Sequence, residues 1–479
     1  MTALWTAQEI AAATKGRTGG TWSASGVSID TRTLKTSDLF VALQGPNFDG
    51  HNFVDAALAA GAAGALVHRE VPAAPDSKLE SGKSHNRLVV VKDTFSGLQD
   101  LAKASRARTN AKVVAVTGSV GKTGTKEALK VALGALGETY ATEGNLNNHW
   151  GVPLSLARLP RDTRYGVFEL GMNHAGEIAP LARLAQPHVA IVTAVEAVHL
   201  EFFPSVDAIA DEKASIMDGL VAGGTAILPR DSASYHRLAA AAAQRGCRAM
   251  SFGSHGAAAL LVAWSLTPSG TQVAADIAGH RHTYEIGVAG RHWALNSVAV
   301  LAAVHALGGD VAKAAAALAR LTAPTGRGAH RRVAGPGGAF VVIDESYNAS
   351  PASIRALAET LGAIDVSGGR RILVLGDMLE MGATAPAIHA DLAPALRANN
   401  IDLVFTAGPL MEHLHNALPR EMRGGHARDS ATLAPRVTQA VRANDVVAVK
   451  GSHGSRMAVV VAAITALDAS SAPRAANGH

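Results

Sequence analysis

Short runs of apolar residues recur through the middle of the chain, each followed by a segment of helical composition. Four of these runs are continuous, with no alternation of apolar and polar positions, at residues 113–117, 167–170, 189–195 and 225–228. Continuous apolar runs are typical of parallel strands that helices cover on both faces. The pattern therefore predicts an α/β region with a mainly parallel sheet over about residues 108–323.

The same pattern resumes after residues 324–328, a segment rich in turn-forming residues that we interpret as a hinge. Four further apolar runs alternate with helical segments, at residues 340–343, 372–375, 403–407 and 446–449. A second, Rossmann-like α/β domain is therefore expected over residues 324–469. Residues 470–479 are expected to be a disordered tail.

The first 107 residues carry shorter elements than the rest of the chain. Strands are expected at residues 38–43 and 88–91, with a helix at residues 53–61 between them. A polar stretch at residues 76–86 is expected to be a flexible loop. This section is predicted to form a small α/β domain, which gives the chain three domains in all.

Composition excludes several classes of protein. A chain of 479 residues is too long for one hydrophobic core, and 48% hydrophobic with 17% charged residues is ordinary for a globular protein. The net charge of +5 is spread without a basic cluster, which argues against a nucleic-acid partner. Cys247 is the only cysteine, so an internal disulfide and a cysteine-based zinc site are excluded.

Nothing in the sequence indicates a membrane protein. The amino terminus lacks the basic and apolar regions of a signal peptide. The longest apolar run, at residues 457–467, is too short to span a bilayer. We therefore expect a cytoplasmic protein without membrane insertion.

The most informative motif is Gly-Ser-Val-Gly-Lys-Thr at residues 118–123, which joins a buried strand to a helix. Gly118 and Gly121 let backbone N–H groups turn toward phosphate oxygens, and the helix N-terminus adds positive potential. Lys122 can then reach the β- and γ-phosphates, and the Thr123 hydroxyl can hold Mg²⁺. The loop is shorter than the standard nucleotide-binding pattern, and a glycine-rich turn without a nucleotide is the alternative. The Lys-Thr pair at the helix start favours a nucleotide.

Three residues beyond this loop are candidates for metal or reaction chemistry. Glu169 ends the second central strand, where its carboxylate either reaches a magnesium ion held by Thr123, caps a helix or is a solvated group. His199 follows the third strand and is interpreted either as a structural residue or as a ligand of a second cation. Lys213, taken alone, reads as a solvated charge on a helix, because a reactive amine must lose its proton far below its ordinary pKa.

Two polar segments follow strands of the C-terminal region. Residues 344–351 come after the strand at 340–343, and residues 376–382 come after the strand at 372–375. Helix capping alone explains each segment. Two such segments at one edge of a sheet favour a ligand cleft.

Four segments, in this order along the chain, resemble the Mur ligase family of peptidoglycan synthesis. They are the phosphate loop at 118–123, an asparagine-rich segment at 144–153, the strand end at 169–174 and residues 376–382. The resemblance covers nearly the whole chain. Residues 344–351, 376–382 and 449–452 favour the dipeptide-adding members, and the Asp-Asn-Pro-Arg motif of the diamino-acid-adding members is absent.

The resemblance implies a three-domain α/β fold. It implies a UDP-sugar-peptide-binding domain at 1–107, a central P-loop ATPase domain at 108–323 and a Rossmann-like domain for the incoming dipeptide at 324–469. It further implies a monomeric enzyme that uses ATP and two Mg²⁺ ions, with UDP-N-acetylmuramoyl-tripeptide and D-alanyl-D-alanine as substrates. ATP phosphorylates the carboxylate that ends the tripeptide, and the dipeptide amine then displaces phosphate from the acyl phosphate.

The resemblance also implies roles for individual residues. ATP binding is implied for Gly118, Ser119, Val120, Gly121, Lys122, Thr123, Asn296, Arg327 and Asp344. Metal binding is implied for Thr123, Glu169, His199 and Lys213, the last as a carbamate. A catalytic role is implied for Lys122, His199, Lys213, Asn147 and Asn148. Substrate binding is implied for Ser28, Asp30, Arg32, Asp49, His51, Tyr347 and Asn348.

The sequence departs from the family pattern at two places. Trp293 stands where the family usually has asparagine, so the neighbouring adenine contact is expected to differ. Phe202 and Phe203 stand where the dipeptide-adding members more often have a glycine-containing sequence, so the loop after His199 is expected to differ as well.

Three alternatives to a dipeptide-adding ligase remain open. Another Mur-type or a folylpolyglutamate-type ligase would share the central domain. A nucleotide-binding protein that has lost catalysis would be expected to lose some of the candidate residues, all of which are present. A P-loop kinase would transfer phosphate to a stable acceptor and would not form an acyl phosphate.

Overall fold

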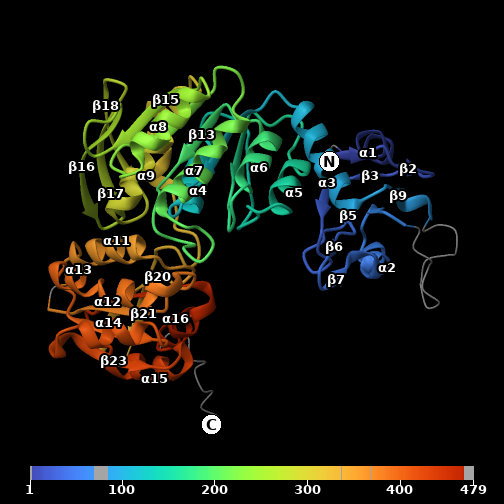
Figure 1. Cartoon of the computed structure of the whole chain (residues 1–479). Helices are drawn as coiled ribbons and strands as arrows, with labels where there is room; N and C mark the ends of the chain where they lie inside the picture. The colour runs from blue at the N-terminus through green and yellow to red at the C-terminus, as the bar shows by residue number, and fades with distance from the viewer. Residues whose placement is uncertain (1–2, 70–84, 336, 367, 469–479) are drawn as a thin grey trace, which may run out of the picture.

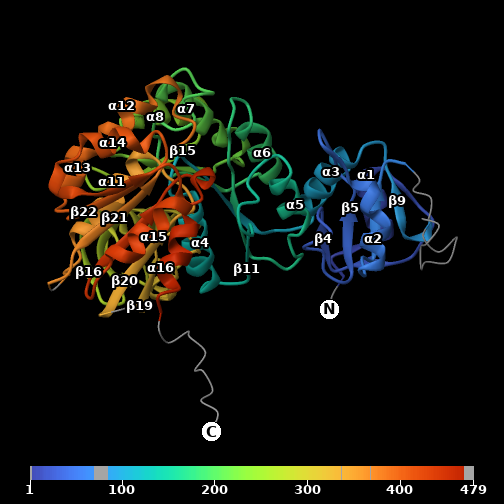
Figure 2. The same ribbon diagram turned by 90° about the horizontal axis from the view of Figure 1, so that it is seen from below.

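The computed structural model describes residues 3–69, 85–335, 337–366 and 368–468. Its three large sheets have five, nine and six strands, and each collects strands from one continuous part of the chain. Figure 1 shows the N-terminal part (blue) beside the central part and the C-terminal part (orange and red) beneath the central part. In the view from below, the N-terminal part joins the rest through two packed helices, α3 (Thr94–Ala107) and α5 (Gly151–Ala157) (Figure 2).

The N-terminal part is a small α/β unit. Its elements are β1 (Trp5–Thr6), α1 (Ala7–Thr14), β2 (Arg17–Thr18), β3 (Ser23–Ala24), β4 (Gly26–Ser28), β5 (Asp38–Val41), β6 (Gln44–Gly45), β7 (Phe48–Asp49), a 3₁₀ turn (Gly50–Phe53), α2 (Val54–Ala59), β8 (Gly64–Val67), a 3₁₀ turn (His85–Arg87), β9 (Leu88–Val90) and α3. The sheet order is β2-β9-β8-β5-β4, parallel except at the edge strand β2. Because side chains alternate along a strand, Leu39 and Val41 pack toward α1 and α3, whereas Phe40 packs toward α2.

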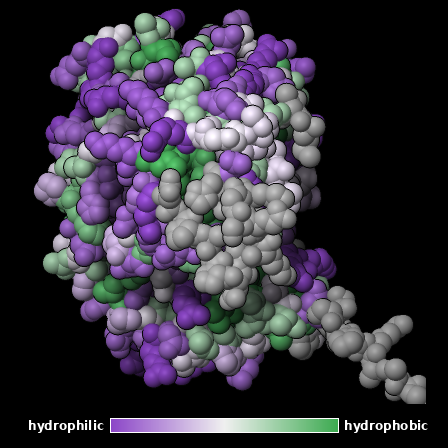
Figure 3. Space-filling model, turned by 90° about the vertical axis from the view of Figure 1, so that its right-hand side faces the viewer, coloured by the Kyte–Doolittle hydropathy of each residue, from purple (hydrophilic) through white to green (hydrophobic). Residues whose placement is uncertain are grey.

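The predictions for this region are confirmed in outline. The strands expected at 38–43 and 88–91 are β5 and β9, and the helix expected at 53–61 is α2. The loop expected at 76–86 lies outside the described residues except at its end. On the face that carries this region, apolar side chains form small patches among hydrophilic ones (Figure 3).

The central part is one nine-stranded sheet between two layers of helices. Its elements are β10 (Lys112–Thr117), α4 (Lys122–Gly134), β11 (Thr139–Ala141), α5, β12 (Tyr165–Glu169), α6 (Ile178–Ala185), β13 (Val189–Val192), α7 (Val206–Ala214), a 3₁₀ turn (Ser215–Gly219), β14 (Thr225–Pro229), α8 (Tyr235–Gln244), β15 (Arg248–Gly253), β16 (Ala259–Thr267), β17 (Gly270–Ile277), β18 (His280–Ile286), α9 (Arg291–Ala306), α10 (Val311–Ala317) and a 3₁₀ turn (Leu318–Arg320). The order is β11-β12-β10-β13-β14-β15-β16-β17-β18. Helices α4 and α9 cover one face, and α5 to α8 cover the other.

The four parallel strands that the apolar runs predict are confirmed as β10, β12, β13 and β14. The antiparallel end of the sheet, β16 to β18, was not predicted. In β17 apolar residues such as Val273, Ala275 and Ile277 alternate with less buried ones, so no continuous run marks the strand.

The C-terminal part is a second α/β unit with its own sheet. Its elements are β19 (Ala329–Gly335), β20 (Gly338–Glu345), α11 (Pro351–Gly362), β21 (Arg371–Gly376), a 3₁₀ turn (Gly382–Thr384), α12 (Ala385–Ala390), α13 (Ala393–Ala398), β22 (Leu403–Ala407), α14 (Met411–Ala417), a 3₁₀ turn (Arg420–Met422), β23 (Arg423–Ala427), α15 (Ser430–Ala440), β24 (Val446–Lys450), a 3₁₀ turn (His453–Ser455) and α16 (Ala458–Thr465). The order is β19-β20-β24-β21-β22-β23, parallel except for the β19–β20 hairpin.

The four strands expected here are confirmed, whereas β19 and β23 were not predicted because both are polar or glycine-rich. The tail expected at 470–479 lies outside the described residues. No helix in the described ranges has both the length and the apolar character needed to cross a bilayer. The loops that follow β10, β12 and β13 meet those that follow β20, β21 and β24 around one cavity.

Candidate functional site

A cavity of about 630 Å³ lies between the central and C-terminal sheets. It brings together most of the site residues that the sequence predicts outside the N-terminal part. These are Ser119, Val120, Gly121, Lys122, Thr123, Asn147, Asn148, Glu169, His199, Asn296, Arg327, Tyr347 and Asn348.

The phosphate loop has the backbone that its sequence requires. Gly118 and Gly121 have φ angles of 152° and 84°, and a Cβ at Gly118 would collide with Thr193. Gly121 is the N-cap of α4, so the loop leads directly into a helix N-terminus. Lys122 donates from Nζ to the Gly118 carbonyl at 2.7 Å, and burial lowers the pKa of this amine. Asn296 lies against Gly121, which places an amide beside the loop.

Thr123, Asn147 and Glu169 form a hydrogen-bonded set on the floor of the cavity. The Thr123 hydroxyl donates to Glu169 Oε2 at 3.0 Å, and Asn147 Nδ2 donates to Glu169 Oε1 at 2.8 Å. Glu169 is only 1% exposed. The carboxylate is thus fixed one hydrogen bond away from the phosphate-loop threonine. Asn148 instead uses its Oδ1 to accept the N–H groups of Trp150 and Gly151 at the start of α5.

The structure corrects the interpretation of Lys213 as a solvated charge. It lies on α7 and is 2% exposed, and burial together with the nearby Lys122 charge lowers its pKa well below the ordinary value. Its Nζ makes no hydrogen bond or ion pair with another residue that the structure describes. The helix pattern did not reveal this burial, because Asp211 and Glu212 flank the lysine and suggest a polar surface.

His199 reaches the C-terminal part through Glu380. The two side chains meet at 2.6 Å between Nδ1 and Oε2, and both residues have positive φ angles, of 57° and 62°. Burial lowers the pKa of His199 and outweighs the opposite effect of the Glu380 carboxylate. Sequence reasoning named the segment 376–382 but not Glu380 itself. The signal that could have identified Glu380 is a carboxylate in the loop that follows a strand.

Arg327, in the hinge, stacks its guanidinium on the ring of Tyr347 in the C-terminal part. The guanidinium of Arg327 lies 4.0 Å from the centre of the Tyr347 ring, and the Tyr347 hydroxyl accepts Asn145 Nδ2 at 3.0 Å. Asp344, in contrast, does not line the cavity, and its carboxylate accepts the backbone N–H and the hydroxyl of Ser346.

A buried ion pair, which the sequence did not indicate, forms another wall. Lys450 Nζ donates to Glu345 Oε2 at 2.8 Å. Burial raises the pKa of Glu345, but the charges of Lys450 and His292 outweigh it, so this pKa lies below its ordinary value. His292, at the start of α9, is also in the cavity wall, and its Nδ1 has no hydrogen-bond partner among the described residues.

The predicted substrate residues of the N-terminal part lie outside this cavity. The Ser28 hydroxyl donates to the Asp30 carbonyl, and Asp30 pairs with Arg32 at 2.6 Å. Asp49 accepts His51 Nδ1 at 2.7 Å and Arg69 at 2.7 Å. Ser28 ends β4 and Asp49 ends β7, so both clusters belong to the same small unit.

The aromatic residues that depart from the family pattern pack against named neighbours in the central part. The Trp293 ring is 5% exposed and packs against Gly124 of α4, where a Cβ would collide with it. Phe203 is buried in the central core, and the more exposed Phe202 ring lies 4.7 Å from the His174 ring.

Comparison with known families covers most of the chain. The Mur ligase middle domain matches residues 116–304, the Mur ligase glutamate ligase domain matches 330–453, and the Mur ligase family catalytic domain matches 23–106.

Individual relatives agree. The UDP-N-acetylmuramoyl-tripeptide–D-alanyl-D-alanine ligase of Escherichia coli is 34% identical over 442 residues, which cover 91% of this chain and 93% of that protein. The enzyme of the same name from Bacillus subtilis is 32% identical, over 91% of this chain and 92% of that protein. A crystal structure of MurF from Acinetobacter baumannii matches with a TM-score of 0.83 at 29% identity, over 96% of this chain and 99% of that chain. MurF ligase from Thermotoga maritima in complex with ADP matches with a TM-score of 0.76 at 26% identity, over 93% and 98%. This chain belongs to the Mur ligase family.

Proposed function

We propose that this protein is an ATP-dependent ligase that adds D-alanyl-D-alanine to UDP-N-acetylmuramoyl-tripeptide in peptidoglycan synthesis. One observation carries the proposal: a phosphate loop and a fixed carboxylate face the C-terminal sheet across a single cavity. The relatives that match over nearly their whole length carry this activity in their names. We assign UDP-substrate binding to residues 1–107, ATP binding to 108–323 and dipeptide binding to 324–469.

The phosphate loop fits the triphosphate of ATP. Its N–H groups lie at the start of α4, where the helix dipole favours anions. The Lys122 ammonium makes one hydrogen bond, to the Gly118 carbonyl of the same loop. A triphosphate offers this amine a stronger partner than a carbonyl. Asn296, Arg327 and Asp344 complete the proposed ATP site, with Asp344 acting by shaping the turn at Ser346.

The residues present also fit Mg²⁺. No group of three His, Cys, Asp or Glu converges anywhere in the described ranges, so a cage made of protein alone is not found. Mg²⁺ in phosphoryl-transfer sites usually takes one or two protein oxygens together with phosphates and water. The Thr123 hydroxyl and the Glu169 carboxylate supply this set. A bound Mg²⁺ would neutralise phosphate charge, and His199 with Lys213 would hold a second ion.

Lys213 is suited to become a carbamate. A buried amine with a lowered pKa and no partner is a neutral nucleophile, whose nitrogen can attack the carbon of CO₂ and lose a proton to water. The product is an N-carboxylate anion next to Lys122. A ¹³C NMR signal from protein equilibrated with ¹³CO₂, absent in Lys213→Arg, tests this step. A spectrum without such a signal in the wild type contradicts it.

The proposed chemistry follows from the position of these groups. The terminal carboxylate of the tripeptide attacks the γ-phosphorus, and ADP leaves with the electrons of the broken P–O bond. Lys122 and Arg327 offset charge on the phosphates, while Asn147 and Asn148 line the path of the peptide. The dipeptide amine then attacks the acyl carbon, phosphate leaves, and the amine loses a proton. Tyr347 and Asn348 line the cavity from the C-terminal part, to which we assign the dipeptide.

Product mass spectrometry tests the assignment directly. Purified protein with ATP, UDP-N-acetylmuramoyl-tripeptide and D-alanyl-D-alanine should yield the pentapeptide product, ADP and phosphate. Turnover with a single amino acid and none with the dipeptide would indicate another ligase of this family. Hydroxylamine should trap a hydroxamate from the acyl phosphate, which a kinase would not give. We further propose that the enzyme acts as a cytoplasmic monomer. Size-exclusion chromatography with light scattering tests the oligomeric state.

A further inference from the structure

His199 and Glu380 both line the large cavity, but they come from different parts of the chain. His199 follows β13 of the central part, and Glu380 follows β21 of the C-terminal part. Their side chains meet at 2.6 Å between Nδ1 and Oε2. The pair therefore links the two α/β units that enclose the cavity.

The backbone is unusual at both of these residues. The φ angles of His199 and Glu380 are 57° and 62°, in the left-handed region that residues with a Cβ adopt infrequently. Such conformations persist only where the surrounding structure enforces them, and they concentrate at functional sites. Here they bring together one side chain from each part, which indicates that the contact does more than fill space.

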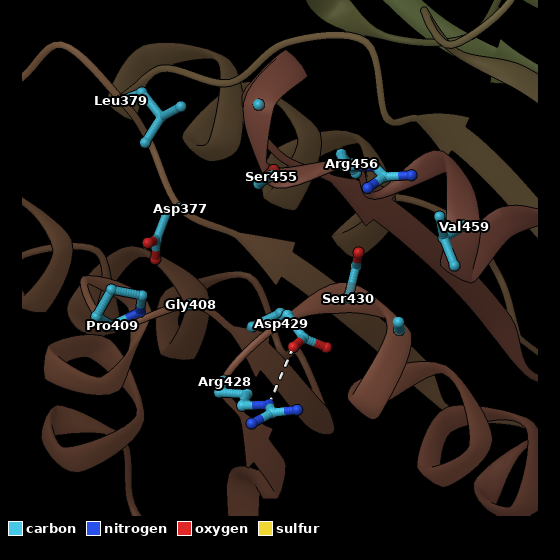
Figure 4. Close-up of a pocket in the computed structure, with 13 residues that line it drawn as sticks. Asp377, Leu379, Gly408, Pro409, Arg428, Asp429, Ser430, Ser455, Arg456 and Val459 are labelled. Atoms are coloured by element: carbon cyan, nitrogen blue, oxygen red, sulfur yellow. Dashed lines mark hydrogen bonds and ion pairs between the residues drawn. The ribbon is translucent and has the colours of Figure 1, made fainter.

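The loop that carries Glu380 is held by hydrogen bonds on its approach to this residue. The Met378 N–H donates to Nε2 of the fully buried His389 at 3.0 Å. The Leu379 N–H donates to the Ser452 hydroxyl, also at 3.0 Å. Figure 4 shows Leu379 on the stretch of chain that leads to Glu380, beside a smaller pocket of about 420 Å³. A fixed loop therefore presents the Glu380 carboxylate.

The loop that carries His199 is attached to the C-terminal part on both sides of the histidine. Val198 is buried in a hydrophobic cluster whose other buried members all come from the C-terminal part. After the histidine, the Leu200 carbonyl lies against Gly382, where a Cβ would be 3.7 Å from the oxygen. The two loops thus form one unit around the bond between His199 and Glu380.

We propose that Glu380 is a positioning residue that prepares His199 to bind a cation in the large cavity. The inference rests on the proposed function, in which His199 helps to hold the second cation. A carboxylate only accepts hydrogen bonds, so the bond between the two side chains requires a proton on Nδ1. In a neutral ring Nε2 then keeps its lone pair, and it makes no hydrogen bond with any described residue. Metal-binding histidines commonly donate from their second nitrogen to a carboxylate, which fixes the tautomer and the orientation of the ring.

The cation site is therefore completed from outside the central part. The residues assigned to the two cations, Thr123, Glu169, His199 and Lys213, all belong to the central part, whereas the group that orients His199 belongs to the C-terminal part. Moving the two parts away from each other would remove the acceptor from Nδ1 and leave the ring free to change its tautomer. Binding of the second cation is thereby coupled to the position of the C-terminal part.

Two measurements that need no turnover test the proposal. The tautomer of His199 is read from ¹⁵N NMR of histidine-labelled protein, in which its signals are those that disappear in His199→Gln. Mn²⁺ binding is measured by EPR in the presence of β,γ-methylene-ATP. Wild type is compared with Glu380→Ala and Glu380→Gln, and Glu421→Ala is the control. Glu421 is an exposed residue of the C-terminal part that lines neither cavity.

The largest change is expected in Glu380→Ala. The wild-type ring should carry its proton on Nδ1, whereas this variant should show a mixture of both tautomers. The second Mn²⁺ should bind about 10-fold or more weakly, because partners that orient a metal ligand typically contribute that much to affinity. Glu380→Gln keeps a neutral acceptor, so the tautomer should persist and the affinity should fall less. The first Mn²⁺ should bind as in wild type, and Glu421→Ala should change nothing.

The outcomes separate this proposal from the proposed function. An unchanged tautomer in Glu380→Ala, or an unchanged affinity for the second Mn²⁺, overturns the role of Glu380, because both effects are required. Equal weakening of both Mn²⁺ ions would mean that the variant disturbs the whole cavity, and a wild type that binds a single Mn²⁺ would have no second site, so either result also overturns it. Neither measurement involves the dipeptide. A wild type that fails to add D-alanyl-D-alanine would therefore refute the proposed function while the role of Glu380 is still decided.

Discussion

Charged side chains are paired in one region of the molecule and left without a counter-charge in another. The first region is the cluster of Asp49, His51 and Arg69, which we call the N-terminal cluster, and the second is the large cavity. Around Asp49 each charge has its counterpart, because His51 and Arg69 both donate to the carboxylate. In the large cavity, Lys122 is bonded only to a carbonyl. Lys213, buried on α7 and not among the residues that line the cavity, has no hydrogen-bond or ion-pair partner among the described residues. Arg327 lies over a ring and not beside a carboxylate.

The difference indicates that the large cavity, and not the N-terminal cluster, is the region that binds a polyanion. Burying a cation without a counter-charge is unfavourable, and the Lys122 ammonium meets only a carbonyl. A triphosphate would supply the missing counter-charge, so this arrangement is what an ATP site requires before ATP binds. The paired N-terminal cluster instead holds loops in place, and its substrate contacts must use what those pairs leave exposed.

The largest effect is expected from Lys122→Met. If the unbalanced lysine serves the triphosphate, kcat/KM should fall about 100- to 1,000-fold, and ATP should no longer raise Tm. Without ATP the variant should be no less stable than wild type, because it removes a half-buried charge that meets only a carbonyl. Lys130→Met changes an exposed lysine of the same helix and should alter neither quantity. Wild-type turnover in Lys122→Met would refute the role assigned to this amine.

The next effect concerns a buried lysine that is balanced. Lys126 is fully buried, and its Nζ pairs with the Glu127 carboxylate at 2.9 Å. The same Nζ donates to the carbonyls of Thr142 and Gly144 at 2.8 and 3.0 Å. It thereby ties α4 to the loop that carries Asn147, so we expect it to be a positioning residue. Lys126→Met should lower kcat about 10- to 100-fold with little change in the KM for ATP.

A double-mutant cycle separates positioning from general loss of stability. In an Asn147→Ala background, Lys126→Met should lower kcat much less than it does in wild type, because the group it positions is absent. Equal effects in both backgrounds would show that Lys126 acts elsewhere. Urea unfolding of each variant reports the loss of stability independently.

The sequence was a good guide where a continuous pattern or an ordered motif existed. It predicted the strands that end at the cavity, and with them the placement of Thr123 beside Glu169. It failed for β16 to β18: β17 and β18 carry no continuous apolar run, and the apolar run that begins β16 was not recognised as a strand. It also misjudged Lys213, because burial on a helix flanked by acidic residues depends on what packs against it from far along the chain.

Contacts between domains were the least predictable part of the site. His199 and Glu380 are 181 positions apart, and nothing in either local segment specifies the other. Within the C-terminal part, the ion pair of Glu345 with Lys450 was equally hidden, because the two residues end strands that are neighbours in the sheet but far apart in the chain. Only the strand order places these ends side by side, and strand order is not written in any one segment.

A smaller effect is expected from Tyr347→Phe. The change removes the hydrogen bond from Asn145 across the cavity but keeps the ring over which Arg327 lies. One exposed hydrogen bond contributes about 1 kcal/mol, so kcat/KM should fall by no more than about 5-fold. Tyr347→Ala removes the ring as well and should cost distinctly more. Equal losses in the two variants would mean that the ring contact with Arg327 contributes nothing to turnover.

The smallest expected effect concerns the N-terminal cluster, where the charges are paired, and it is measured as the pH dependence of the stability of the fold. His51 donates from Nδ1 to Asp49 and accepts the His68 N–H at Nε2, so the folded protein holds it neutral. Burial lowers its pKa despite the Asp49 carboxylate, whose own pKa lies at about 2 because hydrogen bonds from His51 and Arg69 outweigh its burial. The unfolded chain therefore binds a proton at His51 more readily, and stability contributed here is lost as pH falls below about 6.5.

His51→Gln should make that acid-side loss shallower, because glutamine keeps an acceptor for the His68 N–H but cannot take up a proton. Urea unfolding between about pH 5 and pH 7.5 measures the slope, with His305→Gln, an exposed histidine of α9, as the control. An unchanged slope would mean that His51 can be protonated in place beside Asp49 at no cost. The N-terminal cluster would then not be the closed, balanced network that sets it apart from the large cavity.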